Sequence, residues 1–249
     1  MHSFRAALCG LLCLLLTPAL AERLRVATAA SFVPALDVLA PAIREDLDIS
    51  LEIIPGASGA LFAQIRQGAP FDLFLSADEL RPQELVRSGH ARADSMTRYS
   101  RGKLVLYSPR RPASAALLQQ ADARLAIANP VLAPFGSAAQ QALARLAPQQ
   151  RLQLIQGNSV SQAFHFAWSG NADMALVAHA QVLQSGNADD ASVWVVPTEF
   201  YEPLYQAGVI PRQSKAPAAA QALLDWLTGE ARQSQLVALG YLPLAGGTP

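Results

Sequence analysis

Short runs of apolar residues alternate along the chain with segments in which apolar residues recur every three or four positions. In the first half, strand patterns cover residues 24–30, 49–54 and 71–75, and helical patterns cover residues 32–46, 60–66 and 79–88. Short apolar runs that alternate with helical segments are typical of parallel strands covered by helices. Pro41 lies inside the first helical pattern and predicts a kink or a break there.

The alternation restarts after a strand pattern at residues 98–109. Further strand patterns cover residues 123–130, 151–157, 172–182 and 192–197, helical patterns cover residues 136–146 and 159–170, and two amphipathic helices are predicted at 216–229 and 230–241. Two runs of strand–helix units predict an α/β fold with two lobes, each a mostly parallel sheet covered by helices. Ligands of such sheets bind outside the carboxyl ends of the strands, which here means the cleft between the lobes.

The predicted division assigns residues 22–103 and 206–249 to lobe 1 and residues 104–205 to lobe 2. The chain is expected to cross between the lobes near residues 99–107 and again near residues 201–209.

Residues 1–21 have the pattern of a cleaved signal peptide. Arg5 lies in a short positive region, residues 6–16 are apolar, and Ala19-Leu20-Ala21 supplies a cleavage site. The apolar run is too short to span a bilayer comfortably. Both cysteines, Cys9 and Cys13, fall inside this segment. The sequence therefore predicts a soluble periplasmic protein, beginning at Glu22, without disulfides.

The charge pattern excludes several classes of partner and cofactor. The 19 basic and 19 acidic residues balance, so no strong field attracts nucleic acid or an acidic membrane. No nucleotide-binding glycine loop, zinc-protease motif or remaining thiolate is present after residue 21. We expect neither a cofactor nor a nucleic-acid partner, and a monomer is the default.

Small and hydroxyl residues follow strands at four places where a helix begins. The four turns are residues 29–31, 56–59, 134–137 and 158–161. A helix N-terminus leaves backbone N–H groups unpaired and carries roughly half a positive charge, so it can bind an anion. Each serine could instead cap its own helix. Four such turns, two in each lobe, favour an anion site in the cleft.

The sequence of these turns resembles the periplasmic molybdate-binding proteins of ABC transporters over nearly the whole mature chain. The most similar stretch is GASGALFAQIRQGAPFDLFLSAD, residues 56–78, and VATAASF, NPVLAPFGSAAQQAL and GNSVSQAFHFAWSGNADMALVA resemble the other turns. The resemblance implies a receptor that binds molybdate, and also tungstate, between two lobes and delivers it to permease subunits in the membrane. It implies hydroxyl donors and backbone donors at the following positions: Ser31 and Ser58 through their hydroxyls, Phe135 and Val160 through their N–H groups, and amides near Ala30 and Gly59.

One position departs from this family. Part of the family has a tyrosine donor where this chain has Ala178, and Asn158 or Tyr201 are candidates to replace it.

Two alternatives stay open at the level of sequence. Another oxyanion such as sulfate would suit the same donors, whereas phosphate would need an acceptor for its proton, and no acidic residue falls inside the four turns. A serine hydrolase using Ser58 would need the pattern G-x-S-x-G, which Ala60 interrupts, and Asp173 and His179 supply a triad only nominally. The sequence favours a binding protein over an enzyme.

Overall fold

The computed structural model describes residues 22–149, 151–186 and 189–244. The predicted signal peptide lies outside the described residues. Within them, no helix has the length and apolar character that crossing a membrane requires.

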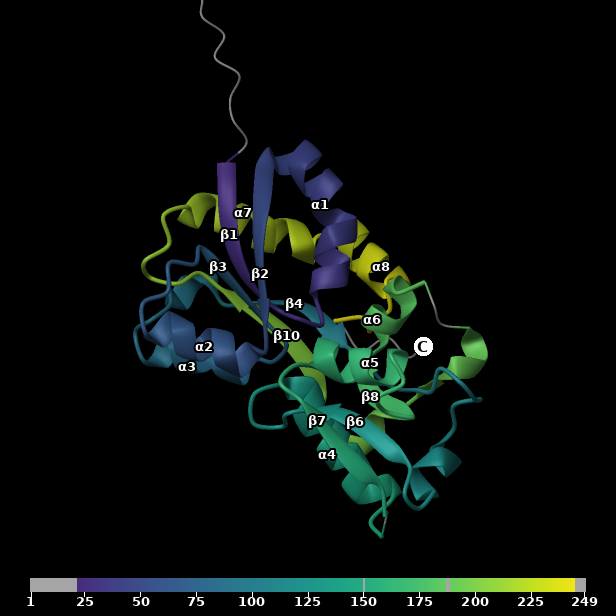
Figure 1. Ribbon diagram of the computed structural model, residues 1–249. Coiled ribbons are helices and arrows are strands. Elements are labelled where there is room, and N and C mark those ends of the chain that lie inside the picture. Colours follow the sequence, from purple (N-terminus) through teal and green to yellow (C-terminus); the bar gives the residue numbers. More distant parts are fainter. Residues whose placement is uncertain (1–21, 150, 187–188, 245–249) are drawn as a thin grey trace, which may run out of the picture.

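Two five-stranded sheets organise the chain into two lobes (Figure 1). The first sheet has the order β2-β1-β3-β10-β4 and consists of β2 (Ile49–Gly56), β1 (Glu22–Ala29), β3 (Leu73–Ser76), β10 (Leu204–Val209) and β4 (Thr97–Gly102). β1 is parallel to β2 and β3, whereas β10 is antiparallel to β3 and β4.

The second sheet has the order β7-β6-β8-β5-β9 and consists of β7 (Gln153–Gly157), β6 (Arg124–Ala128), β8 (Met174–Ala178), β5 (Leu104–Tyr107) and β9 (Val193–Val195). β6 is parallel to β7 and β8, and β5 is antiparallel to β8 and β9. The predicted α/β fold with two mostly parallel sheets is therefore confirmed.

Helices cover the faces of both sheets, as Figure 1 shows. The α-helices are α1 (Val33–Leu47), α2 (Ser58–Arg66), α3 (Leu80–Arg87), α4 (Pro134–Leu146), α5 (Val160–Trp168), α6 (His179–Gln184), α7 (Pro217–Thr228) and α8 (Glu230–Ala238), and short 3₁₀ helices lie at Ala93–Ser95, Ala115–Gln119, Asp190–Ser192 and Thr198–Phe200. In β3, Leu73 and Leu75 pack under α1, α7 and α8, whereas Phe74 faces α2 and α3 on the other side. The short apolar run of β3 thus reflects burial on both faces.

Four sequence expectations need correction. α1 continues through Pro41, whose ring lies on the exposed side of the helix. The strand pattern at 98–109 is two strands, β4 and β5, in different sheets, and the pattern at 172–182 becomes helix α6 from His179 onward. β10, for which the sequence predicted no strand, covers Leu204–Val209 in the first sheet.

The register of the parallel strands brings the helix starts together. Ala29 at the end of β1 pairs with Gly56 at the end of β2, and Ala128 at the end of β6 pairs with Gly157 at the end of β7. In each lobe, two turns therefore leave the sheet side by side, at its carboxyl edge.

Gly136 allows α4 to approach the end of β6 closely. A Cβ atom at this position would lie 2.3 Å from the carbonyl oxygen of Ala128 and 2.8 Å from its carbonyl carbon. Because both atoms are backbone, the contact can be relieved only by moving the helix or the strand.

We therefore expect Gly136→Ala to lower the free energy of unfolding by about 1–3 kcal/mol through overpacking. Ser137→Ala, one residue along the same helix, should change it by less than about 0.5 kcal/mol. Urea unfolding of both variants measures the difference. Equal stability of Gly136→Ala and wild type would mean that the start of α4 is free to shift away from β6.

Candidate anion site between the lobes

Lobe 1 contributes two buried serines at the ends of β1 and β2. Ser31 and Ser58 are each 1% exposed. The Ser58 hydroxyl oxygen accepts a hydrogen bond from the backbone N–H of Ala77 at 3.0 Å, which leaves its own proton free to donate elsewhere. The Ser31 hydroxyl is buried without any partner among the described residues.

Neither serine caps its helix, which answers the alternative raised by the sequence. The N-cap of α2 is Ala57 and that of α1 is Phe32, and neither forms a side-chain cap hydrogen bond. A buried hydroxyl without a partner is costly, so an unused donor at Ser31 points to a ligand.

Lobe 2 contributes the first turns of α4 and α5. Phe135 is the second residue of α4 and Val160 is the first residue of α5. Their backbone N–H groups, like those of Ser31 and Ser58, have no hydrogen-bond acceptor within the part of the chain that the structure describes. The side chains of Phe135 and Val160 are buried, so only their amides are available to a solute.

These donors line one small cavity. Its wall consists of Ala29, Ala30, Ser31, Gly56, Ala57, Ser58, Ala77, Ala133, Pro134, Phe135 and Val160, and only about 10 Å³ is open to the centre of a water-sized sphere. No charged side chain belongs to this wall. A bulky organic solute does not fit such a space.

The electrostatics of the cavity come from the backbone. α2, α4 and α5 begin at its wall, and none of the three has an acidic residue in its first turn to neutralise the positive end of the helix dipole. Hydroxyl and amide donors without an acceptor carboxylate favour a fully deprotonated anion.

Two buried tyrosines hold carbonyl groups of lobe 1 at or next to residues of the cavity wall. Tyr241 donates to the carbonyl of Ser31 at 3.0 Å, and Tyr99 donates to that of Ser76 at 3.0 Å. Both pack edge-on against Phe32. Burial raises the pKa of both tyrosines, which keeps them neutral and able to donate.

The other predicted donors either already have a hydrogen-bond acceptor or lie outside the cavity wall. The amide of Ala30 donates to the carbonyl of Gly56 at 2.9 Å and that of Gly59 to the carbonyl of Leu132 at 2.8 Å, so both already have acceptors. Asn158 is exposed and lies outside the cavity wall. The Tyr201 hydroxyl accepts from the backbone of Leu104 at 3.2 Å, and it too lies outside the wall.

Sequence reasoning missed the residues that hold the two lobes together around the cavity. Gln181, on α6 just after Ala178, donates to the carbonyl of Ala30 at 3.3 Å and also to the Ser161 hydroxyl, and Ser161 donates to the same carbonyl at 3.2 Å. Gln181 is 6% exposed, although its sequence context shows only a polar residue in a short amphipathic segment. No pattern in the sequence marks such a contact between lobes.

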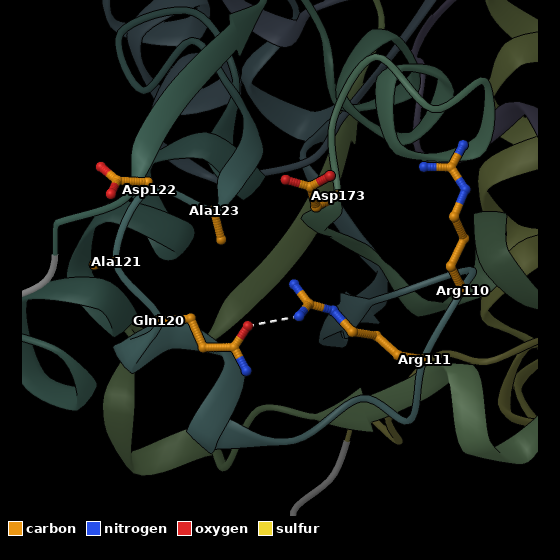
Figure 2. A pocket seen from close by; sticks show the side chains of 7 residues that line it. All are labelled: Arg110, Arg111, Gln120, Ala121, Asp122, Ala123 and Asp173. Atoms are coloured by element: carbon orange, nitrogen blue, oxygen red, sulfur yellow. Dashed lines mark hydrogen bonds between the residues drawn. The ribbon is translucent and has the colours of Figure 1, made fainter.

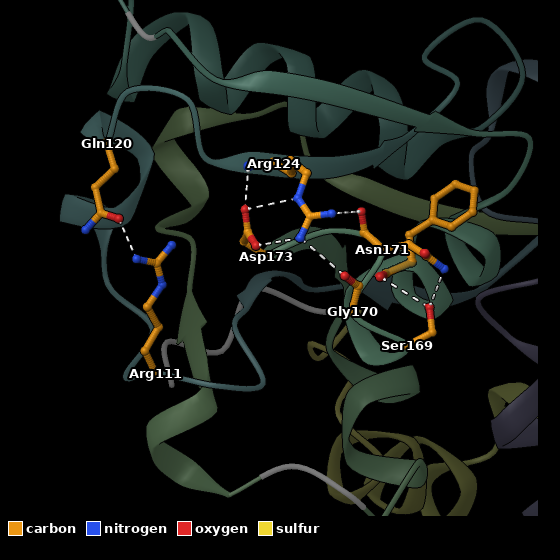
Figure 3. Close-up of polar contacts among 8 residues, drawn as sticks. Arg111, Gln120, Arg124, Ser169, Gly170, Asn171 and Asp173 are labelled. Carbon is orange, nitrogen blue, oxygen red and sulfur yellow. Dashed lines mark hydrogen bonds and ion pairs between the residues drawn. The ribbon is translucent and has the colours of Figure 1, made fainter.

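A larger open pocket, of about 390 Å³, has a different chemistry (Figure 2). It mixes Arg110 and Arg111 with Asp122 and Asp173 and lies beside the amino ends of β6 and β8, at the edge of the sheet away from the cavity. Arg124 holds Asp173 through its guanidinium and its backbone N–H (Figure 3), and these hydrogen bonds lower the pKa of Asp173. Its carboxylates disfavour a dianion, and Asp173 is committed to an ion pair rather than to a triad with Ser58.

Two α/β lobes that enclose a donor-lined cavity define a solute-binding receptor. The chain belongs to the family of bacterial extracellular solute-binding proteins, whose model matches residues 24–242. It is 38% identical over 234 residues to the molybdate-binding protein ModA of Azotobacter vinelandii, covering 92% of this chain and 93% of that protein. It is 37% identical to ModA of Rhodobacter capsulatus, covering 84% of each.

The fold agrees with these relatives. The solved periplasmic molybdate-binding protein of Azotobacter vinelandii superposes with a TM-score of 0.77 at 34% identity, covering 88% of this chain and 98% of that one. This membership confirms the family resemblance and the expectation of a binding protein rather than an enzyme.

The two serines should respond differently to removal of the hydroxyl in the ligand-free protein. Ser58→Ala leaves the buried N–H of Ala77 without an acceptor, so we expect a loss of about 1–3 kcal/mol in the free energy of unfolding. Ser31→Ala removes a hydroxyl without a partner and should not lower it. Denaturant unfolding without ligand measures both.

Ser95→Ala is the control for Ser58→Ala. Ser95 is 1% exposed, accepts from the backbone N–H of Ile210 at 3.0 Å and donates to the carbonyl of Arg92 at 2.8 Å, away from the cavity wall. Because Ser95→Ala removes both hydrogen bonds, its loss of stability should be at least as large as that of Ser58→Ala. A Ser58→Ala chain as stable as wild type would contradict the Ala77 hydrogen bond.

Proposed function

We propose that this chain captures molybdate, and also tungstate, as a soluble monomeric receptor in the periplasm and delivers it to an ABC transporter permease. The observation that carries the proposal is the closed cavity whose wall offers hydroxyl and amide donors and no charged side chain. The names of its relatives, molybdate-binding proteins, support this choice of anion. The predicted signal peptide supports export, and the balanced charge argues against a nucleic-acid partner.

In this proposal the oxyanion oxygens accept hydrogen bonds from both lobes. The hydroxyls of Ser31 and Ser58 would donate from lobe 1, and the amides of Phe135 and Val160 from lobe 2. Molybdate and tungstate carry no proton at neutral pH, so each oxygen can act as an acceptor. Among the described residues, no group of three or more His, Cys, Asp or Glu side chains is arranged to hold a metal ion.

Sulfate is the second candidate, because it is also a tetrahedral dianion without a proton at neutral pH. The donor set does not distinguish it from molybdate. The discrimination must come from the size of the closed cavity, and the molybdate relatives favour the larger anion.

A thermal-shift panel on the mature chain tests the choice of anion. Ligand stabilisation follows RT ln(1 + [L]/Kd), or about 2.7 kcal/mol at one hundred times Kd. For a chain of this size we expect molybdate and tungstate to raise Tm by several degrees, roughly 5–10 °C, and equal sulfate or phosphate to raise it far less. An equal shift with sulfate would overturn the molybdate assignment and leave the anion cavity in place.

Removing either cavity hydroxyl should weaken molybdate binding. A charge-assisted hydrogen bond to a buried dianion is worth about 1.5–3 kcal/mol, so Ser31→Ala and Ser58→Ala should each raise Kd about ten- to two-hundredfold. Calorimetric titration measures this change.

Ser95→Ala is again the control, because it should lose stability without losing affinity. The two measurements then separate the serines: Ser95→Ala affects folding only, Ser31→Ala affinity only, and Ser58→Ala both. Wild-type affinity in Ser31→Ala would contradict a hydroxyl donor at that position.

A further inference from the structure

Lobe 1 holds two consecutive carbonyl groups of lobe 2 beside the anion cavity. The carbonyl of Leu132 accepts from the backbone N–H of Gly59 at 2.8 Å, and the carbonyl of Val131 accepts from the guanidinium of Arg81 at 2.7 Å. Because each pair joins residues of different lobes, both contacts exist only when the lobes are closed.

Arg81 is fixed for this contact from within its own lobe. Its other terminal nitrogen pairs with the carboxylate of Asp78, which also accepts from the backbone N–H of Arg81 at 3.3 Å and from the Ser76 hydroxyl at 2.9 Å. The Arg81 and Asp78 side chains are only 16% and 20% exposed. A guanidinium held this way loses little further conformational entropy when it meets Val131.

Gly59 allows the backbones of the two lobes to approach each other. A Cβ atom at Gly59 would lie 3.0 Å from the carbonyl oxygen of Leu132 and 3.1 Å from the nearest terminal nitrogen of Arg81. A side chain at this position would therefore require the Leu132 backbone and the Arg81 guanidinium to give way by a few tenths of an ångström.

The contacted loop is tied by hydrogen bonds to Asn129 and leads into the donor turn of α4. The Asn129 side chain accepts from the N–H of Val131 at 2.9 Å, and the Asn129 carbonyl accepts from the N–H of Ala133 at 2.8 Å. Phe135, a predicted anion donor, follows two residues later. Holding Val131 and Leu132 therefore also positions the Phe135 amide against lobe 1.

We propose that Gly59 and Arg81, held by Asp78, form a latch on residues 131–132 that stabilises the closed state and sets how slowly the bound anion leaves. In this role Arg81 is a positioning residue and does not contact the anion. The proposal rests on the proposed function, since it assigns these residues to the affinity and release of the same oxyanion.

The test compares Arg81→Ala and Gly59→Ala with wild type in the full mature chain. Loss of a partly exposed charge-assisted hydrogen bond should raise the molybdate Kd and dissociation rate about three- to tenfold in Arg81→Ala. The association rate should stay near wild type, because the contacts with residues 131–132 are absent from the open state. The Tm without ligand should fall in Arg81→Ala, because this change also removes the ion pair with Asp78 inside lobe 1. Gly59→Ala should change the dissociation rate in the same direction.

Arg87→Ala is the matched control. Arg87 lies on the same helix and forms an ion pair with Glu84 three residues earlier, but its side chain is 78% exposed and this partner lies within α3. Its removal should leave the dissociation rate unchanged. Wild-type dissociation rates in both Arg81→Ala and Gly59→Ala would overturn the latch.

A second measurement keeps the latch testable without molybdate. The mature chain has no cysteine, so Gln64→Cys on α2 and Gln140→Cys on α4, both exposed, can carry a fluorophore pair that reports the separation of the lobes. If wild type binds none of the oxyanions, the proposed function fails, and the latch is judged on the ligand-free chain. A smaller closed fraction in Arg81→Ala than in wild type would support it, and equal distributions would overturn it.

Discussion

One constraint governs the proposed function: a doubly charged anion, removed from water, would have to be held by neutral donors alone. Burying an unpaired charge is very costly, and only a full set of hydrogen bonds can replace its hydration. The starts of α2, α4 and α5 and two serine hydroxyls supply donors without a competing cation or carboxylate in the cavity wall. Small residues at these positions keep side chains out of the way, so the backbone itself faces the solute.

The fold supplies these donors in two halves. Aligned ends of β1 and β2 deliver Ser31 and Ser58, and lobe 2 delivers Phe135 and Val160 beside the aligned ends of β6 and β7. Neither lobe alone surrounds a solute, so tight binding and lobe closure are one event. In the proposed function, contacts between the lobes such as those of Gln181 and Ser161 with Ala30 would therefore contribute to affinity without touching the ligand.

The sequence predicts what depends on local order and misses what depends on the meeting of distant segments. Ser58 and its turn were predictable because a strand, small residues and a helix follow one another in the chain, and the four helix starts were found for the same reason. β10 was missed because its apolar run is short and contains Gly208, and its place is set by β3 and β4. The sequence also could not predict that the Gly59 amide has a hydrogen-bond acceptor, since that acceptor, the carbonyl of Leu132, lies in the other lobe.

Discrimination between ions in such a cavity depends on the separation of the lobes rather than on the type of donor. Hydroxyl and amide donors bind any unprotonated dianion by the same hydrogen bonds, so donor type alone cannot separate anions of equal charge. The separation of the lobes decides whether the donors of both reach the oxygens at hydrogen-bond distance. If the ion is too small, donors of one lobe stay unpaired in a dry cavity. If the ion is too large, the lobes cannot close far enough to form contacts such as the hydrogen bond from Gly59 to Leu132. Since an unpaired buried donor costs about 1–3 kcal/mol, a few misplaced groups are enough to separate ions by orders of magnitude in affinity.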